Sequence, residues 1–497
     1  MRRLGVVMTF CVLSALLSDA AGAQVTVSVD AAKPVGTVPR ALFGTNLRPN
    51  MQSTPEVLAF VRDIGISAFR YPDSVDGGYS WKWPEGVMMG GGKESLSPLG
   101  KLDGAIDFAR KAGAELCFTV RIQGGATAEE AAEVVRQVKA RGITGAYWCL
   151  GNEPYFTGTD TYFPREKYIA LVRQFAPAIK AADPTAKVGI CWGGPYVNEE
   201  SDPGRDEDIL RATAELVDFA DIHFYVGRPE KETDPWDPLK IVAAPELMKL
   251  WVPKFRNIVR QAAPAKAEGF EVNFWEWNGP PHPTVGGMQL LATAVMGADL
   301  LGVMAESGVT RACQYNLQEH YCGLIPGFQS EWEGTWPTQP WNGVTVRPLA
   351  YAIKLWAKHM GPTLIACTVT GSPTFEVHDW HTLANYQGAA PYIAAHATLS
   401  EDGKTLGLLL INKHPSDDQE VAVRLSGFTP KPEAVVRLLN GPDLLAHNDD
   451  EKAGYRSVPN PPEPKVTLTE SRFGRAASTF TYTLPAHSVT QLDLAKE

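Results

Sequence analysis

Two short segments of the chain each place a glutamate among tryptophans, directly after an apolar run. The first, YWCLGNEP, covers residues 147–154 and contains Glu153, and the second, VNFWEWN, covers residues 272–278 and contains Glu276. A single glutamate at a strand end is usually a solvated loop carboxylate, but two in equivalent positions favour a shared site. One carboxyl group can then donate a proton while the other acts as nucleophile or base, as cleavage of a glycosidic bond requires.

Three further polar residues lie at the ends of predicted strands. Arg70 follows an apolar strand, and a guanidinium a few ångströms from Glu276 would favour the ionised carboxylate, although a surface ion pair is the alternative. His223 and Tyr225 alternate along one strand, so both side chains are expected on the same face. We expect Tyr225 to hydrogen-bond Glu276 and His223 to orient a sugar or a carboxylate. The alternative for His223 is a buried core residue.

Tryptophans gather in the same loops, and flat aromatic side chains stack well on sugar rings, although most tryptophans fill cores. Trp192 and Trp277 are our candidates for substrate contact. The long loop over residues 318–343 holds three more and is expected to shape access to the site. The tryptophans considered are Trp81, Trp83, Trp192, Trp275, Trp277, Trp332, Trp336 and Trp341.

Between residues 43 and 360 the sequence repeats one order of elements: helix, glycine, short apolar strand, polar loop. Thr54 and Pro55 are typical of a helix start, and Gly65 is typical of its end. Apolar strands that alternate with helices are typical of a parallel sheet buried on both faces, so eight such units predict a (β/α)₈ barrel. The predicted strands are 42–46, 66–70, 114–120, 146–150, 187–191, 220–225, 271–275 and 310–315.

In this barrel Glu153 follows the fourth strand and Glu276 follows the seventh. Both therefore lie at the C-terminal mouth, where barrel enzymes build their active sites. The competing doubly wound sheet needs a G-x-G-x-x-G turn after its first strand, and the sequence has none there.

After residue 360 the helical periodicity ends and short alternating strands predict an all-β sandwich. We divide the chain into a signal peptide (1–23), an N-terminal strand segment that could pair with the sandwich (24–42), the barrel (43–360) and the sandwich (361–497). The fold class is thus α/β, a TIM barrel with a C-terminal β-sandwich.

Composition and the N-terminus narrow the partners. The formal charge is −10 with no long basic run, which argues against a nucleic-acid partner. Residues 1–23 combine two arginines, a short apolar stretch and an A-x-A cleavage site, as a secretory signal does. That stretch is too short for a membrane anchor. We expect a secreted or periplasmic protein with no membrane contact after cleavage.

The cysteines show no metal-ligand spacing, and no H-E-x-x-H motif is present, so neither a metal nor another cofactor is expected. Four cysteines lie in apolar strands and are interpreted as buried thiols, Cys117, Cys149, Cys191 and Cys313. A disulfide between Cys313 and Cys322 is the alternative in an oxidising compartment.

With these features the chain resembles the clan of retaining glycoside hydrolases whose barrels carry glutamates after strands 4 and 7. The resemblance implies that Glu153 is the acid/base, that Asn152 contacts the sugar 2-hydroxyl, and that Glu276 is the nucleophile. Within the clan the chain is most similar to the family 51 α-L-arabinofuranosidases. The segments that carry this are LFGTN (42–46), FRYP (69–72), YSW (79–81) and TLPAHSVT (483–490).

Two departures from that family leave the sugar open. Asp73 and Ser74 replace two glycines after the proline of the second strand, and Trp275 replaces an aspartate before the nucleophile. The expected function is an exported retaining O-glycoside hydrolase that acts on poly- or oligosaccharides. The alternatives are a family 39-like β-xylosidase, an endo-acting glycanase, or a carbohydrate-binding protein without activity. Oligomeric state and linkage stay open.

Overall fold

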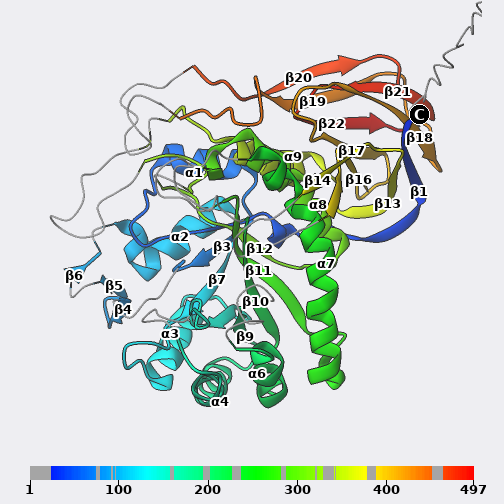
Figure 1. Cartoon of the computed structure of the whole chain (residues 1–497). Helices are drawn as coiled ribbons and strands as arrows, with labels where there is room; N and C mark the ends of the chain where they lie inside the picture. Colours follow the sequence, from blue (N-terminus) through cyan, green and yellow to red (C-terminus); the bar gives the residue numbers. More distant parts are fainter. Residues whose placement is uncertain are drawn as a thin grey trace, which may run out of the picture.

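A closed parallel barrel and a curled β-sheet form the two parts of the molecule (Figure 1). The computed structural model describes residues 24–73, 79–90, 93–95, 97–156, 162–193, 202–226, 237–280, 287–319, 322–327, 341, 343–377, 388–449 and 463–497. The predicted signal peptide, residues 1–23, lies outside the described residues. Among the residues described, no helix is long and apolar enough to cross a membrane.

The barrel confirms the predicted fold class, and its eight strands match the eight expected from the sequence. They close in the order β10-β11-β12-β2-β3-β7-β8-β9, and every neighbouring pair is parallel. Their bounds are β2 Gly44–Asn46, β3 Ala68–Tyr71, β7 Glu115–Val120, β8 Tyr147–Leu150, β9 Lys187–Trp192, β10 Phe219–Tyr225, β11 Glu271–Asn278 and β12 Ala312–Gln314.

Helices surround the barrel, and their ends follow the local signals in the sequence. The Thr54 side chain accepts a hydrogen bond from the Val57 amide at 3.3 Å, and Gly65 ends the same helix in the left-handed region with φ of 82°. The helices are α1 Pro55–Ile64, α2 Leu102–Ala112, α3 Ala128–Ala140, α4 Arg165–Ala182, α6 Arg205–Thr213, α7 Pro238–Ala262, α8 Leu291–Glu306 and α9 Pro348–His359.

A β-bulge in β11 decides which residues face the barrel interior. Asp221 of β10 pairs with Asn273, but His223, two residues later, pairs with Glu276, so β11 carries one extra residue. Successive side chains in a regular strand point to opposite faces. Because of the bulge, Trp275 packs with the interior cluster while Glu276 also reaches the mouth.

The C-terminal part is a nine-stranded sheet among the described residues, in the order β20-β19-β22-β17-β16-β13-β1-β18-β21. Strands from both ends of this order share one core, so the sheet curls over itself as in a sandwich. The bounds are β1 Val25–Thr37, β13 Thr363–Thr370, β16 Ile393–Leu399, β17 Thr405–Asn412, β18 Gln419–Ser426, β19 Ala434–Asn440, β20 Thr467–Phe473, β21 Thr479–Leu484 and β22 Ser488–Ala495.

The N-terminal strand β1 lies inside this sheet rather than in the barrel. It pairs antiparallel with β13 and parallel with β18, and Figure 1 shows it running up beside them. Small additions complete the described elements: β4 Tyr79–Lys82, β5 Val87–Gly90, β6 Lys93–Glu94, β14 Thr374–Val377, β15 Gly388–Pro391, and the 3₁₀ helices η1 Arg40–Leu42, η2 Pro98–Gly100, η3 Pro264–Lys266 and η4 Gly287–Gln289.

Buried charges join the barrel to the sheet. Asp299 of α8 lies 2.6 Å from the Lys413 ammonium and 2.9 Å from His396 Nε2, and His396 Nδ1 lies 2.7 Å from Glu306. His396 lies in β16 and Lys413 directly follows β17, whereas Asp299 and Glu306 belong to the barrel helix α8. We call these four side chains the interface cluster. A buried ion pair is tolerated when its partners satisfy each other in this way.

Candidate active site

The Glu276 carboxylate is held on both oxygens at the C-terminal mouth of the barrel. Arg70 Nη1 donates to Oε2 at 2.6 Å, and the Tyr225 hydroxyl donates to Oε1. Arg70 is fully buried, and the Glu276 side chain is 10% exposed. Burial alone would lower the pKa of Arg70, but the negative charges of Glu276 and Asp221 raise it far above its usual value. A permanently charged guanidinium therefore favours an ionised Glu276.

Glu153 occupies a different environment a few ångströms away. One carboxylate oxygen of Glu153 and one of Glu276 lie within 4.8 Å of each other. Glu153 Oε1 lies 2.9 Å from His223 Nδ1 and accepts from the Tyr155 hydroxyl at 3.4 Å. Its side chain is 24% exposed, so it opens to the mouth more than Glu276 does.

A sharp backbone turn places Glu153 at the mouth of the barrel. Gly151 has φ of 84°, and Glu153 itself has φ of 47°, a region that residues with a side chain rarely adopt. Such a conformation costs about 1–3 kcal/mol and persists at functional sites, where the surrounding structure enforces it. The strain therefore supports a functional role for the Gly151–Glu153 turn.

Two asparagines complete the contacts of Arg70. Its Nη2 donates to Asn152 Oδ1 at 2.5 Å, and Nη1 also donates to Asn46 Oδ1 at 3.1 Å. Because the Asn152 oxygen accepts from Arg70, its amide NH₂ is the group left to face a substrate oxygen. Asn46 in turn donates to the Trp275 carbonyl at 2.9 Å, which ties β2 to the bulge of β11.

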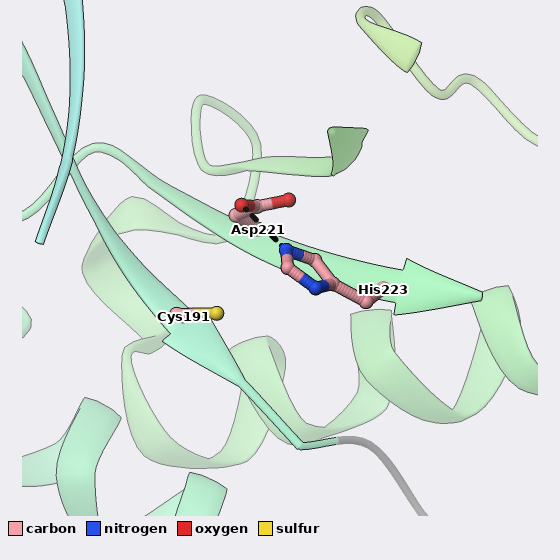
Figure 2. A group of neighbouring side chains, drawn as sticks. All are labelled: Cys191, Asp221 and His223. Carbon is pink, nitrogen blue, oxygen red and sulfur yellow. Dashed lines mark ion pairs between the residues drawn. The ribbon is translucent and has the colours of Figure 1, made fainter. Parts of the chain in front are cut away.

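His223 joins the two glutamates to a third carboxylate below them. Its Nδ1 lies 2.9 Å from Glu153 and 3.5 Å from Glu276, and its Nε2 lies 3.4 Å from Asp221 Oδ2. Figure 2 shows the Asp221 and His223 side chains pointing toward each other in the barrel interior, with Cys191 on the neighbouring strand. Burial lowers the pKa of His223, but the negative charges of Glu276 and Asp221 raise it well above its usual value.

The predicted tryptophan contacts are wrong for Trp192 and Trp277. Both are fully buried on the outer side of the barrel wall. The Trp192 ring packs 6.1 Å from Phe255 of α7, and the Trp277 ring lies beside Gly297 of α8. Alternation along each strand turns these side chains toward the helices, where large aromatics fill the layer between sheet and helix. Trp332 and Trp336 lie outside the described residues.

Sequence reasoning missed Asn46 and Asp221, which contact the predicted residues directly. A signal was available for Asp221, since it stands two residues before His223 on one strand and so shares its face. Sequence reasoning also missed the ion pair between Arg48 and Asp73, which lies beside Tyr315. Arg48 donates to Asp73 at 2.6 Å and to the Tyr315 hydroxyl at 2.7 Å, and the Tyr315 ring lies 6.4 Å from that of Tyr225.

Two overlapping sets of three side chains bring potential metal ligands within 4.8 Å, one with Cys191, Asp221 and His223, the other with Glu153, His223 and Glu276. The buried guanidinium of Arg70 contacts Glu276, and its charge opposes a second cation beside it. Hydrogen bonds and ion pairs already engage these carboxylates, so we interpret both sets as proton-handling groups. The expected absence of a cofactor stays a prediction.

The cysteines agree with the interpretation as thiols. Cys117, Cys149, Cys191 and Cys313 are free and buried. Cys322 is also free, so the alternative disulfide with Cys313 is not formed, and its sulfur instead contacts the Glu319 carboxylate.

Comparisons with known proteins agree with the interpretation of the site as that of a glycoside hydrolase. No protein-family model matches the chain. Its barrel, its sheet and its paired glutamates agree with a glycoside hydrolase, and the comparisons support that class. An "Intracellular exo-alpha-(1->5)-L-arabinofuranosidase" from Bifidobacterium longum is 22% identical over an alignment of 549 positions, gaps included, which covers 94% of this chain and 91% of that protein.

The structural neighbours confirm the resemblance to family 51 α-L-arabinofuranosidases. The family 51 enzyme from Thermotoga petrophila RKU-1 has a TM-score of 0.75 at 19% identity and covers 94% of this chain and 99% of its own. The Thermotoga maritima α-L-arabinofuranosidase, in an arabinose complex, also has a TM-score of 0.75, at 20% identity, covering 95% of this chain and 100% of its own. At these identities the likeness establishes the fold.

Proposed function

We propose that this protein hydrolyses glycosidic bonds by double displacement with retention, using Glu276 as nucleophile and Glu153 as acid/base. The observation that carries this is the separation of at most 4.8 Å between an oxygen of each carboxylate. Retaining enzymes hold the two groups about 5–5.5 Å apart, whereas inverting enzymes need about 6.5–9.5 Å to admit a water. The different environments of the two glutamates support different roles.

In the first step Glu276 attacks the anomeric carbon, and a carbon–oxygen bond to the enzyme forms as the bond to the leaving group breaks. Arg70 and Tyr225 keep Glu276 ionised and fixed in orientation before attack. Glu153 gives its proton to the departing oxygen, so the leaving group departs as an alcohol.

In the second step water attacks the anomeric carbon and Glu153 takes a proton from it. The ester to Glu276 breaks, the sugar is released and Glu276 returns as a carboxylate. Asn152, whose oxygen is held by Arg70, is placed to donate to a sugar hydroxyl near the nucleophile. The same side chains thus serve both steps, with Glu153 reversing its role.

For the substrate we propose a terminal α-L-arabinofuranosyl residue on an oligo- or polysaccharide. The sequence relative from Bifidobacterium longum and the two Thermotoga neighbours bear this activity in their names. The second candidate is a β-xyloside. It is kept because Asp73, which binds Arg48 where the family has a glycine, changes the rim after β3 and leaves the sugar open.

We also propose that the protein is exported, on the strength of the signal-like residues 1–23. The Bifidobacterium longum relative is described as intracellular, so export would set this chain apart from it. Fractionation of the native host into medium, periplasm and cytoplasm, followed by N-terminal sequencing of the protein, tests this. A mature chain beginning near Gln24 is the expected result, and an intact Met1 in the cytoplasm contradicts it.

The activity is tested with a panel of nitrophenyl glycosides that includes the α-L-arabinofuranoside and the β-D-xyloside. The native protein is compared with Glu276→Ala and with Glu268→Ala, an exposed glutamate just before the same strand. We expect one glycoside to be hydrolysed, a loss of about 10⁴-fold or more in Glu276→Ala, and native activity in Glu268→Ala. Proton NMR of the first sugar released then reports the anomer. An inverted product contradicts double displacement, and silence on the panel and on arabinan and xylan contradicts the proposed activity.

A further inference from the structure

Asp221 is a buried carboxylate directly beneath the two glutamates, and the mechanism above does not use it. It is fully buried. Its Oδ1 accepts a hydrogen bond from the Trp275 amide at 2.9 Å, and its Oδ2 lies 3.4 Å from His223 Nε2 (Figure 2). A buried carboxylate is costly without compensating charge. The structure therefore gives Asp221 one backbone donor and one imidazole nitrogen as its close partners.

The carboxylates around His223 determine which of its two ring nitrogens is expected to carry a proton. An ionised carboxylate only accepts hydrogen bonds, so a proton on Nε2 makes its 3.4 Å approach to Asp221 Oδ2 favourable. On the opposite side of the ring, Nδ1 faces Oε1 of Glu153 at 2.9 Å and Oε2 of Glu276 at 3.5 Å. If Nδ1 also carries a proton, it donates to Glu153 Oε1 together with the Tyr155 hydroxyl. The acidic proton of Glu153 then belongs on Oε2, the other oxygen.

We propose that Asp221 is a positioning residue that keeps His223 doubly protonated, so that this imidazolium supports whichever catalytic glutamate carries the negative charge. The inference rests on the proposed function. In the resting site the charged groups are Arg70, His223, Glu276 and Asp221, which sum to zero with Glu153 protonated.

After the first step Glu276 is an uncharged ester and Glu153 is a carboxylate. The sum is again zero, since the proton has left with the alcohol. The negative charge has moved from Glu276 to Glu153, and both lie within 3.5 Å of the same Nδ1 atom. No further charge has to enter the buried site, where it would be poorly solvated.

Charged or titratable groups face His223 from several strands, and all of them enter the expected pH dependence. They are Glu153 after β8, Cys191 of β9, Asp221 of β10 and Glu276 of β11, with Arg70 of β3 paired to Glu276. The carboxylates favour the imidazolium, and Arg70 opposes it at longer range.

The variant Asp221→Asn tests the assignment because the Trp275 amide constrains its orientation. The amide needs an acceptor, so the asparagine oxygen takes the place of Oδ1 and its NH₂ takes the place of Oδ2. That NH₂ cannot accept from Nε2–H, so His223 loses a proton and its charge. Glu153 then loses the cation beside its Oε1, whereas Arg70 stays paired with Glu276.

We therefore expect the alkaline limb of the pH profile of kcat/KM, which reports the Glu153 proton, to move to higher pH in Asp221→Asn by about one pH unit or more, and the acid limb, which reports Glu276, to move less. The matched control is Asp183→Asn, another buried aspartate, which accepts from the Gly145 and Thr185 amides at loops away from the mouth. Its limbs should not move. In a His223→Gln background, Asp221→Asn should cause no further shift. A uniform loss of rate with unmoved limbs, or additive shifts in the double variant, would overturn the proposal.

A measurement on the native protein keeps the test independent of folding and of activity. Nitrogen-15 labelling of histidine, with His223→Gln for assignment, reports the protonation of each ring nitrogen. We expect both nitrogens of His223 to carry protons at pH 7. A neutral ring at that pH contradicts the inference even if the enzyme is active. An imidazolium in a protein that hydrolyses no glycoside would contradict the proposed function and leave the assignment of His223 standing.

Discussion

Two histidines of this protein each lie between two carboxylates, one in the barrel mouth and one at the joint with the sheet. His223 stands between Glu153 and Asp221, and His396 stands between Glu306 and Asp299. Both rings are almost fully buried. The neighbours differ, however, because a third carboxylate, Glu276, lies 3.5 Å from His223, whereas the interface cluster adds the Lys413 ammonium at 2.6 Å from Asp299.

The difference lies in the balance of charges. The interface cluster has two carboxylates and two cations, so every charge has a fixed partner. The mouth has three carboxylates, Glu153, Glu276 and Asp221, for the two cations Arg70 and His223. One carboxylate must hold a proton for the buried charges to balance. A balanced cluster holds two parts of the fold together, whereas the third carboxylate of the mouth fits the proton donor that the proposed mechanism needs.

Removing Lys413 should unbalance the interface cluster and give the largest change in stability. In Lys413→Met the buried Asp299 loses its ammonium partner, and we expect the free energy of unfolding to fall by about 3–5 kcal/mol. Denaturant unfolding followed by tryptophan fluorescence measures this. Lys404→Met removes an exposed lysine near Asp402 and should leave stability unchanged. An equal loss of stability in Lys413→Met and Lys404→Met would contradict the role of the buried Lys413–Asp299 ion pair.

The pH dependence of stability also tests the difference between the interface cluster and the barrel mouth. Burial lowers the pKa of His396, but Glu306 and Asp299 raise it to about 9. Because this lies above the value of about 6.5 in the unfolded chain, the stabilisation is complete below about pH 6.5 and is lost as the pH rises toward 9. We expect a loss of about 3 kcal/mol over that range from this group.

Unfolding curves at a series of pH values between 6 and 10 measure the effect. His396→Gln should have a flatter dependence over this range because its side chain does not titrate. A variant as steep as the native protein would show that other groups govern the alkaline loss.

Tyr225→Phe should give the smallest effect, since it removes a neutral donor and leaves the charge count of the mouth unchanged. The lost hydrogen bond to the charged Glu276 is worth about 1.5–3 kcal/mol, which corresponds to a decrease of about 10- to 100-fold in kcat/KM. Stability should change little. Tyr392→Phe, a half-buried tyrosine of the sheet domain, serves as control and should retain native activity. Loss of stability without loss of activity in Tyr225→Phe would contradict its assigned position.

Most of the barrel could be predicted because its strands are short apolar runs bounded by glycines, and the eight predicted strands coincide with those observed. Glu153, Glu276, Arg70, His223 and Tyr225 were also predictable, since each stands at the C-terminal end of such a strand. The sheet was harder. Strand β20 is largely exposed along its length, so it lacks the alternation that marks a half-buried strand.

What the sequence could not give is the face on which each side chain lies. Trp277 and Glu276 are neighbours in one strand, and only the bulge in β11 decides that Glu276 faces the mouth while Trp277 faces α8. A bulge depends on pairing between strands that are distant in sequence, so residue types alone do not reveal it.

Strand β1 gives the molecule an unusual order of assembly. Val25 pairs with Val421 of β18, and Thr26 pairs with Thr370 of β13. On the ribosome β1 is made before any part of the barrel, yet both of its partners are made after it. A nascent chain that has completed the barrel still carries a strand with two open edges, which invite pairing with other chains. The sheet can close over this strand only after β18, which ends at Ser426, has been made, so a chain released before that point would be prone to aggregate even with its barrel intact.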